Sequence, residues 1–504
     1  MPQDYEFTDY EPVRPGKSSS KTRAPQLYED WPTANPRKFG TEGNDSKDNE
    51  ELETSRVNGA EQPAKVESRG DVQKKGILAR GHGLTYVGLF LFTTVLFFRP
   101  YELFPALSGL TSLAFWIGVA TIAIFIPMQL ALEGSITARP REVTLVVLLT
   151  ALALLSIPLA ISAGDAWLTF GDTFIRAVLI FIVIINVVRT ERRLYGLILL
   201  SLAVSCLLSV GAIGDFRAGN FAQQGRRILG VVGGMFGNPN DLALHLSTMV
   251  PLVIAFFLSY RNLFLKIFFA LCAALFIAAI VATFSRGGFL ALMGAALLLT
   301  WKLGRRQRFL TMTAVFLAFG AFIIFAPGGY LERILSIVGL AADPLGSAAA
   351  RRNVLSHSVY TAFRHPLGIG MGNYHIVGAR EAVSHNAYTQ VAAELGLVAL
   401  VIYVMFMLSP LKRLRQIERE SLDVWETSKN KTARRFYYLA IGLQASLVAY
   451  MVGSFFASVA YQWYVYYLVG YAICLANLHL NWKARNPSLS KEVGMEIDAP
   501  SAAS

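Results

Sequence analysis

The chain has 504 residues, of which 54% are hydrophobic and only 16% are charged, well below the roughly one quarter of charged residues typical of soluble domains. Long uncharged runs on this scale exclude an ordinary soluble enzyme and indicate that the lipid bilayer is the solvent. The formal net charge of +12 would suit a nucleic-acid binder, but the basic residues lie in short loops between apolar runs, where membrane topology explains them better.

Residues 1–76 differ from the rest of the chain. They hold 12 Lys/Arg and 15 Asp/Glu, are rich in Pro, Gly and Ser, and show no apolar periodicity, which predicts a disordered, solvated tail. No apolar stretch follows the first charges, so the tail lacks the pattern of a secretory signal. Docking of a partner by this tail is the less favoured alternative.

The remaining chain predicts an all-α polytopic membrane protein with a transmembrane domain over residues 77–482 and a C-terminal tail over residues 483–504. Most predicted spans are near the ~20 residues needed to cross ~30 Å of hydrocarbon. We expect about 12 transmembrane helices, at residues 84–103, 108–130, 143–161, 172–188, 193–213, 240–259, 264–283, 287–303, 308–326, 388–409, 436–456 and 462–480. No internal repeat or paired broken helices are evident, which weakens a transporter interpretation.

Basic residues in the connecting loops set the orientation. Of the 34 Lys/Arg after residue 76, 23 lie in loops that are cytoplasmic if the N-terminus is inside, and 10 lie outside. This excess satisfies the positive-inside rule, so both termini are expected in the cytoplasm. Two long segments are then external, at about residues 214–239 and at residues 327–387, and the second is a large loop before the tenth helix.

The first external segment ends in two arginines and then in the run Gly-Asn-Pro-Asn-Asp, which opens a helix. Asn240 or Asp241 is the expected cap, and the proline suits the first helical position. Exposed amides at the positive end of a helix are suited to bind an anion, and adjacent guanidinium groups would add charge-assisted bonds to phosphate oxygens. The alternative is an ordinary helix cap with solvated arginines. The candidate binding residues are Arg226, Arg227, Asn238 and Asn240.

The second pattern is Ser285-Arg286-Gly287, at the boundary between two predicted spans. Ser285 is a good N-cap for the following helix. Arg286 is a lone cation at the membrane edge, which either snorkels to the headgroups or faces inward to a ligand.

The third pattern is His385-Asn386, at the start of the tenth predicted span. A helix N-terminus tends to lower the pKa of a histidine, which keeps a neutral imidazole ready to accept a proton. A base at the water–membrane boundary is within reach of an external hydroxyl. The alternative is an interfacial histidine bonded to a loop carbonyl. Glu394, deeper on the same helix, is expected to be a structural partner for a polar group on another helix.

The large external loop contains further polar residues. Residues 351–363, which include Arg352, predict a short amphipathic helix lying on the bilayer. The glycines of the run His-Pro-Leu-Gly-Ile-Gly-Met-Gly-Asn at residues 365–373 predict a flexible loop in which backbone could approach a substrate closely. The loop histidines do not have the spacing of a zinc motif, so no metal site is expected.

These patterns occur in one order on one face, and together they resemble the O-antigen ligase and polymerase (Wzy/WaaL) superfamily. The resemblance covers about residues 84–480 and leaves the polar tail outside. The matching pieces are Gly237–Ala243, Ser285–Gly287, His365–Asn373 and His385-Asn386 with Gly396.

The resemblance implies a GT-C-like helical fold in a bacterial inner membrane, with no metal or cofactor. It implies that Arg286 binds the diphosphate of an undecaprenyl-diphosphate glycan, with Arg227 or Arg226 assisting. It further implies that His385 activates the acceptor hydroxyl and that direct displacement inverts the anomeric centre. Ser285, Asn386 and Arg352 are then additional substrate-binding candidates.

The favoured function is that of a ligase moving a glycan from undecaprenyl diphosphate to lipid A–core on the periplasmic face. A repeat-unit polymerase and a protein O-oligosaccharyltransferase share these motifs and stay open. From a different class, a lipid-linked glycan transporter would need polar residues at mid-membrane on several helices. Arg176 and Glu394 are the few such residues here, and Asp172 is placed to pair with Arg176.

Overall fold

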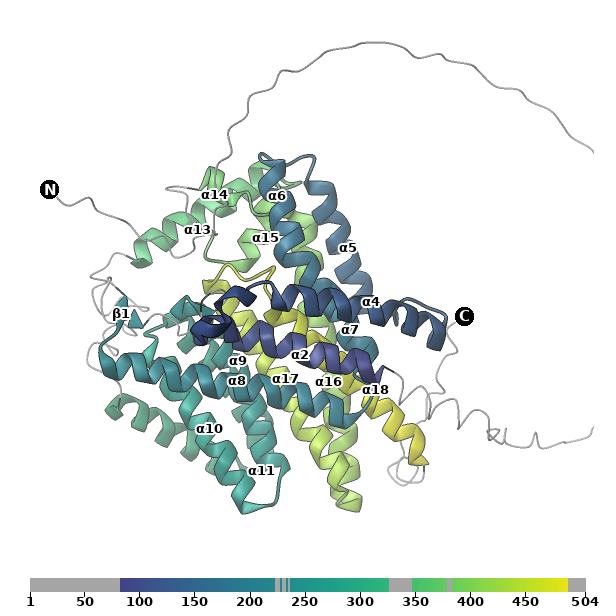
Figure 1. Cartoon of the computed structure of the whole chain (residues 1–504). Helices are drawn as coiled ribbons and strands as arrows, with labels where there is room; N and C mark the ends of the chain where they lie inside the picture. Colours follow the sequence, from purple (N-terminus) through teal and green to yellow (C-terminus); the bar gives the residue numbers. More distant parts are fainter. Residues whose placement is uncertain are drawn as a thin grey trace, which may run out of the picture. The chain divides into compact units, whose positions relative to one another are not determined.

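The computed structural model describes residues 82–222, 227–228, 233, 236–325, 347–378 and 383–487. The predicted tail at residues 1–76 and most of the C-terminal tail lie outside the described residues. The helical elements are α2 (Gly83–Phe98), α3 (Pro100–Leu103), η1 (Pro105–Leu110), α4 (Leu113–Glu133), α5 (Arg141–Ser156), α6 (Ala163–Thr169), η2 (Phe170–Phe174), α7 (Ile175–Val187), α8 (Glu191–Ala218), α9 (Pro239–Ser259), α10 (Leu263–Ala282), α11 (Arg286–Phe325), α13 (Ser347–Arg364), α14 (Tyr374–Val377), α15 (Ala387–Leu395), α16 (Leu397–Ser428), α17 (Lys431–Gly453), η5 (Ser454–Phe456) and α18 (Trp463–Arg485) (Figure 1). Two short strands, β1 (Phe221–Ala222) and β2 (Arg227–Ile228), pair antiparallel, with Phe221 opposite Ile228.

The polytopic all-α membrane fold is confirmed. Within the described ranges, nine helical stretches are long and apolar enough to cross a membrane. The predicted count of about 12 spans stays a prediction. The predicted spans that are not among these nine stretches include α5, which has only 16 residues, and α18, whose tyrosines lower its mean hydropathy. The nine stretches are Gly83–Leu103, Ala106–Glu133, Ala163–Val187, Glu191–Ala218, Pro239–Ser259, Leu263–Ala282, Arg286–Gly304, Leu397–Ser428 and Lys431–Phe456.

Two predicted boundaries are wrong. The spans expected at residues 287–303 and 308–326 form one continuous helix, α11. Lysine, arginine and glutamine in the expected loop are good helix formers, and the single Gly304 costs only about 1 kcal/mol there. Conversely, the span expected at residues 388–409 is divided at Gly396, where φ is 92°, and the second part, α16, continues to Ser428.

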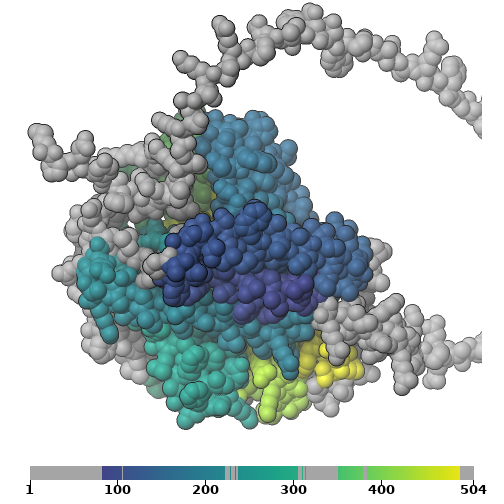
Figure 2. Space-filling model, viewed as in Figure 1, coloured from purple at the N-terminus to yellow at the C-terminus, as the bar shows by residue number. Residues whose placement is uncertain are grey.

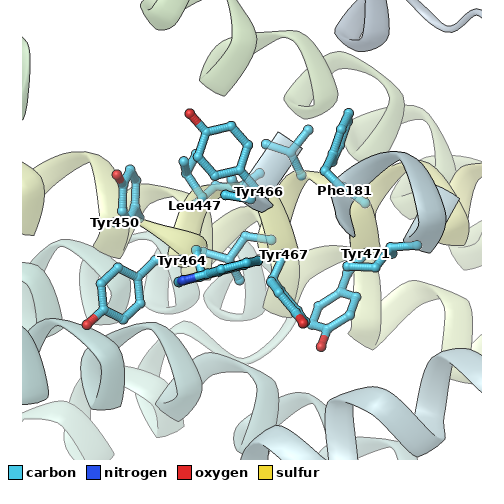
Figure 3. Packing of buried hydrophobic residues seen from close by; sticks show 14 of the residues in the cluster. Phe181, Leu447, Tyr450, Tyr464, Tyr466, Tyr467 and Tyr471 are labelled. Carbon is cyan, nitrogen blue, oxygen red and sulfur yellow. The ribbon is translucent and has the colours of Figure 1, made fainter. Parts of the chain in front are cut away.

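The helix α18 lies in the core of the bundle. Its side chains are buried all round from Trp463 to His479 with few exceptions, the pattern of a helix enclosed by others. Buried tyrosine hydroxyls need partners, and those of α18 reach different helices. Tyr467 lies 2.9 Å from Thr93 of α2 and Tyr471 lies 3.2 Å from Ser201 of α8. Figure 3 shows these two rings on the opposite side of α18 from Tyr466.

The outward faces of several helices are apolar. Figure 2 shows α2 and α4, in purple and blue, on the surface above α8 and α10 in teal. An apolar surface this extensive is unusual for a soluble protein and suits contact with lipid tails. Large exposed apolar side chains on these four helices include Val87, Leu91, Trp116, Val119, Ile126, Leu130, Leu207, Val210, Phe268 and Leu271.

Candidate active site

Asn238 caps the N-terminus of α9. Its side-chain oxygen accepts a hydrogen bond from the backbone N–H of Asn240 at 2.8 Å, and Pro239 occupies the first helical position. The prediction that Asn240 or Asp241 is the cap is therefore wrong. The proline is the physical reason, because it suits the first position inside the helix, which places the cap one residue before it. The side chain of Asn240 is thereby available to another partner.

That partner is on α11. The hydroxyl of Ser285 donates to Oδ1 of Asn240 at 3.0 Å and accepts from the backbone N–H of Gly288 at 3.2 Å. Ser285 thus caps α11, as predicted, and ties it to the start of α9. Contact between the two helices is close, because a Cβ on Gly288 would collide with that of Ala243. Arg286, which is partly buried, is the first residue of α11 and lies at this junction.

Asn386 caps α15 in a similar way. Its Oδ1 accepts from the backbone N–H groups of Tyr388 and Thr389 at 2.9 and 3.1 Å. The residue before the cap, His385, has a φ of 51°. Phe284, before the cap of α11, has a φ of 52°. Non-glycine residues in this left-handed region are uncommon and are strained unless their surroundings hold them, so both turns are fixed by the fold.

The end of α17 and the short helix η5 join the starts of α11 and α15. On one side, a Cβ on Gly287 of α11 would lie 2.7 Å from that of Phe456. On the other side, the hydroxyl of Tyr388 in α15 donates to the carbonyl oxygen of Met451 at 2.7 Å, and its ring centroid lies 6.3 Å from that of Phe455. Gly453 at the end of α17 also lies against Leu244 near the start of α9 and Ala291 of α11. The first turns of α9, α11 and α15 therefore all lie near the end of α17.

Three helix N-termini in one region create a positive electrostatic environment, since each carries about half a positive charge from its aligned peptide dipoles. Arg286 adds a full charge at the same place. Such an arrangement can bind a phosphate or diphosphate group through backbone N–H groups and a guanidinium. His385 precedes the cap of the third helix, so this histidine belongs to the same region.

The glycine-rich run does not form the flexible substrate loop that was predicted. Gly368, Gly370 and Gly372 have φ of 88°, 100° and 71°, and each is packed against protein. A Cβ would overlap the carbonyl oxygen of Glu394 at the first, Ala160 at the second and Thr169 at the third. The physical reason is that glycine permits close approach of any partner, and here the partners are the break between α15 and α16 and the α5–α6 region.

Glu394 holds this packed region together, as expected of a structural residue. Its buried carboxylate accepts from the hydroxyl of Tyr461 at 2.8 Å and from the backbone N–H of Tyr374 at 3.4 Å. Burial raises the pKa of the Tyr374 phenol to about 12. The Tyr374 hydroxyl donates to the carbonyl oxygen of Val354 in α13 at 3.0 Å.

The other predicted residues are placed as follows. Arg352 lies exposed on α13, which contains the predicted helix and packs against α15. Arg226 lies outside the described residues, and of Arg227 only the backbone, in β2, is described. Asp172 and Arg176 form the predicted pair, at 2.6 Å. In the ranges that the structure describes, no group of three or more His, Cys, Asp or Glu side chains could hold a metal ion.

Sequence reasoning missed two contributors. Glu102 of α3 accepts from the backbone N–H of Gly233 at 2.5 Å and pairs with Arg99 at 2.7 Å, which anchors the segment before α9. Gln390 lies one turn after Asn386 on α15. The spacing of four residues was the available signal, because the backbone N–H of a residue in the first turn of a helix donates to the carbonyl oxygen of the cap, as Gln390 does to Asn386 at 2.9 Å.

The region around these contacts matches a known family. The family model described as O-antigen ligase matches residues 270–404. This segment is similar to an O-antigen ligase domain. The match confirms the resemblance to the O-antigen ligase/polymerase superfamily and supports a membrane glycosyltransferase of the ligase or polymerase type. No curated protein matches the chain.

The matched segment includes Arg286 and His385 but not α9. Asn238 and Asn240, which precede the matched segment in the chain, are joined to it through the bond between Asn240 and Ser285.

Proposed function

We propose that the protein is a ligase that transfers a glycan from undecaprenyl diphosphate to an acceptor hydroxyl of lipid A–core at the periplasmic face of the inner membrane. The observation that carries this proposal is the hydrogen bond between Ser285 and Asn240. It supports an anion site because it holds Arg286 where two helix N-termini meet. A lipid diphosphate is an anion that reaches such a site from the bilayer.

The donor is activated by charge neutralisation. Arg286, with Arg227 or Arg226 assisting, binds the diphosphate together with the helix ends and the side chains of Asn238 and Asn240. Guanidinium groups fixed in a water-poor site stabilise developing negative charge by several kcal/mol. The diphosphate then departs with the electron pair of the glycosidic C–O bond, without a metal ion.

The acceptor is activated by His385. Its imidazole takes the proton of the acceptor hydroxyl while that oxygen attacks the anomeric carbon from the side opposite the diphosphate. One bond forms as the other breaks, so the configuration at the anomeric carbon inverts. Both substrates carry lipid, which explains a site at the membrane edge. Arg352, which is exposed on α13, is proposed to contact the glycan.

Deletion of the gene in its native host, with complementation, tests this function. The variants are wild type, Arg286→Ala and His385→Ala, with Arg364→Ala as a matched control because that arginine is exposed at the end of α13. Surface glycolipid and the undecaprenyl-linked pool are analysed by gel electrophoresis and mass spectrometry, and protein levels are measured in membranes.

A ligase predicts a surface acceptor without glycan and long chains retained on the polyprenyl carrier, in the deletion and in both site variants. A surface acceptor bearing one repeat unit, without long carrier-linked chains, would identify a polymerase instead. Loss of glycan from secreted or surface proteins alone would identify a protein O-oligosaccharyltransferase. An Arg286→Ala protein that still moves substrate across the bilayer would favour transport.

A further inference from the structure

Two buried side-chain amide atoms at the start of α15 lack hydrogen-bond partners. Within the described part of the chain, Nδ2 of Asn386 and Oε1 of Gln390 are inaccessible to solvent and make no hydrogen bond. The side chain of Asn386 is almost fully enclosed, with a residue exposure of 2%. An unpaired buried polar atom costs about 1–3 kcal/mol. Two such atoms one turn apart therefore indicate a binding site whose ligand supplies the missing hydrogen bonds.

Helix capping does not account for these atoms. The cap uses Oδ1 of Asn386 and leaves its Nδ2 without a role. The nearby hydroxyls already have partners. Oγ of Ser384 donates to the carbonyl oxygen of Asn386 at 2.7 Å and lies 3.1 Å from the hydroxyl oxygen of Thr389. Gln390 lies inside the helix, where no backbone group needs its side chain.

The chemistry of the two atoms selects the ligand. Nδ2 of Asn386 is a donor and Oε1 of Gln390 is an acceptor. The two residues lie one turn apart, because the backbone N–H of Gln390 donates to the carbonyl oxygen of Asn386 at 2.9 Å. A hydroxyl accepts one hydrogen bond and donates another, so a single hydroxyl satisfies both atoms. A phosphate offers the acceptor Oε1 no proton, and a cation offers the donor Nδ2 no lone pair.

We propose that Asn386 and Gln390 form a hydroxyl-binding subsite that positions the acceptor sugar beside His385. The inference rests on the proposed function, in which His385 removes the proton of the acceptor hydroxyl. The subsite binds a second hydroxyl of the same molecule, so the acceptor is a carbohydrate that offers several hydroxyls near the reacting one. A serine or threonine side chain offers only one.

Steady-state kinetics with purified protein in lipid nanodiscs tests the subsite. The donor is the host's own undecaprenyl-linked glycan, and the acceptor is the glycan-free glycolipid extracted from the deletion strain. Gln390→Met removes the acceptor atom at nearly constant size. Asn386→Asp keeps the capping oxygen and removes the donor. Gln416→Met, at an exposed glutamine of α16, is the matched control.

Loss of one neutral hydrogen bond predicts a rise of roughly three- to tenfold in KM for the acceptor. We expect this in both subsite variants, with an unchanged KM for the donor and a control equal to wild type. The thermal stability of Gln390→Met is expected to be no lower than that of wild type, because the substitution removes an unpaired buried atom. Gln390→Glu retains an acceptor oxygen and is expected to restore most of the affinity lost in Gln390→Met.

Wild-type transfer together with an unchanged acceptor KM in Gln390→Met and Asn386→Asp would overturn the subsite and leave the proposed function intact. A change confined to the donor KM would also overturn it. Wild-type protein that transfers no glycan to the extracted glycolipid would overturn both proposals.

Discussion

Replacement of Gly370 by alanine tests whether the glycine-rich run is packed for structure. Gly370 has a φ of 100°, a backbone conformation that side chains with a Cβ rarely adopt. The new methyl group would overlap the Cβ of Ala160 and lie 2.8 Å from its Cα. That neighbour is held in place, because the next residue, Ile161, donates its N–H to the carbonyl oxygen of Ile369 at 3.0 Å.

The cost has two parts. A left-handed backbone conformation costs a residue with a Cβ about 1–2 kcal/mol, and insertion of a methyl group into a well-packed site costs about 1–3 kcal/mol. Gly370→Ala is therefore expected to lower the free energy of unfolding by about 2–5 kcal/mol. Gly164→Ala is the matched control, because a Cβ there meets nothing within 4 Å and its backbone is helical.

Thermal unfolding in detergent, followed by intrinsic fluorescence, measures the difference. Gly370→Ala is expected to unfold several degrees below wild type, while Gly164→Ala unfolds at or slightly above it, since alanine is favoured over glycine in helices. A Gly370→Ala protein with wild-type stability but no transfer activity would refute the reasoning. It would mean that the glycine serves close approach of a substrate.

Three further outcomes are expected. Ser285→Ala removes the cap of α11 and the bond to Asn240, so thermal unfolding should show a loss of about 2 kcal/mol, and an unchanged midpoint would contradict the proposed junction of α9 and α11. Tyr461→Phe removes a hydroxyl donor from the buried carboxylate of Glu394 and should destabilise by about 1.5–3 kcal/mol in the same assay, whereas equal stability would show that the carboxylate finds another donor. Treatment with EDTA should leave glycan transfer in nanodiscs unchanged, because Arg286 supplies the positive charge, and activity restored only by an added divalent cation would disprove this.

The sequence was sufficient for features that depend on neighbouring residues. Apolar runs located most of the helices, because a span is defined by its own length and composition. Ser285 was recognised as a cap because capping involves residues three positions apart. The order of the short motifs pointed to the O-antigen ligase/polymerase superfamily, which the matched domain confirms.

Features that depend on distant residues required the tertiary structure. Gly370 reads as flexible in the sequence, yet its conformation is decided by Ala160, which is far away in the chain. Asn240 reads as a cap, yet its side chain binds Ser285. Likewise, the unpaired amides of Asn386 and Gln390 become apparent only when the burial and partners of each atom are known. Local propensities act within a turn of the chain, whereas packing and hydrogen-bond satisfaction are settled between elements.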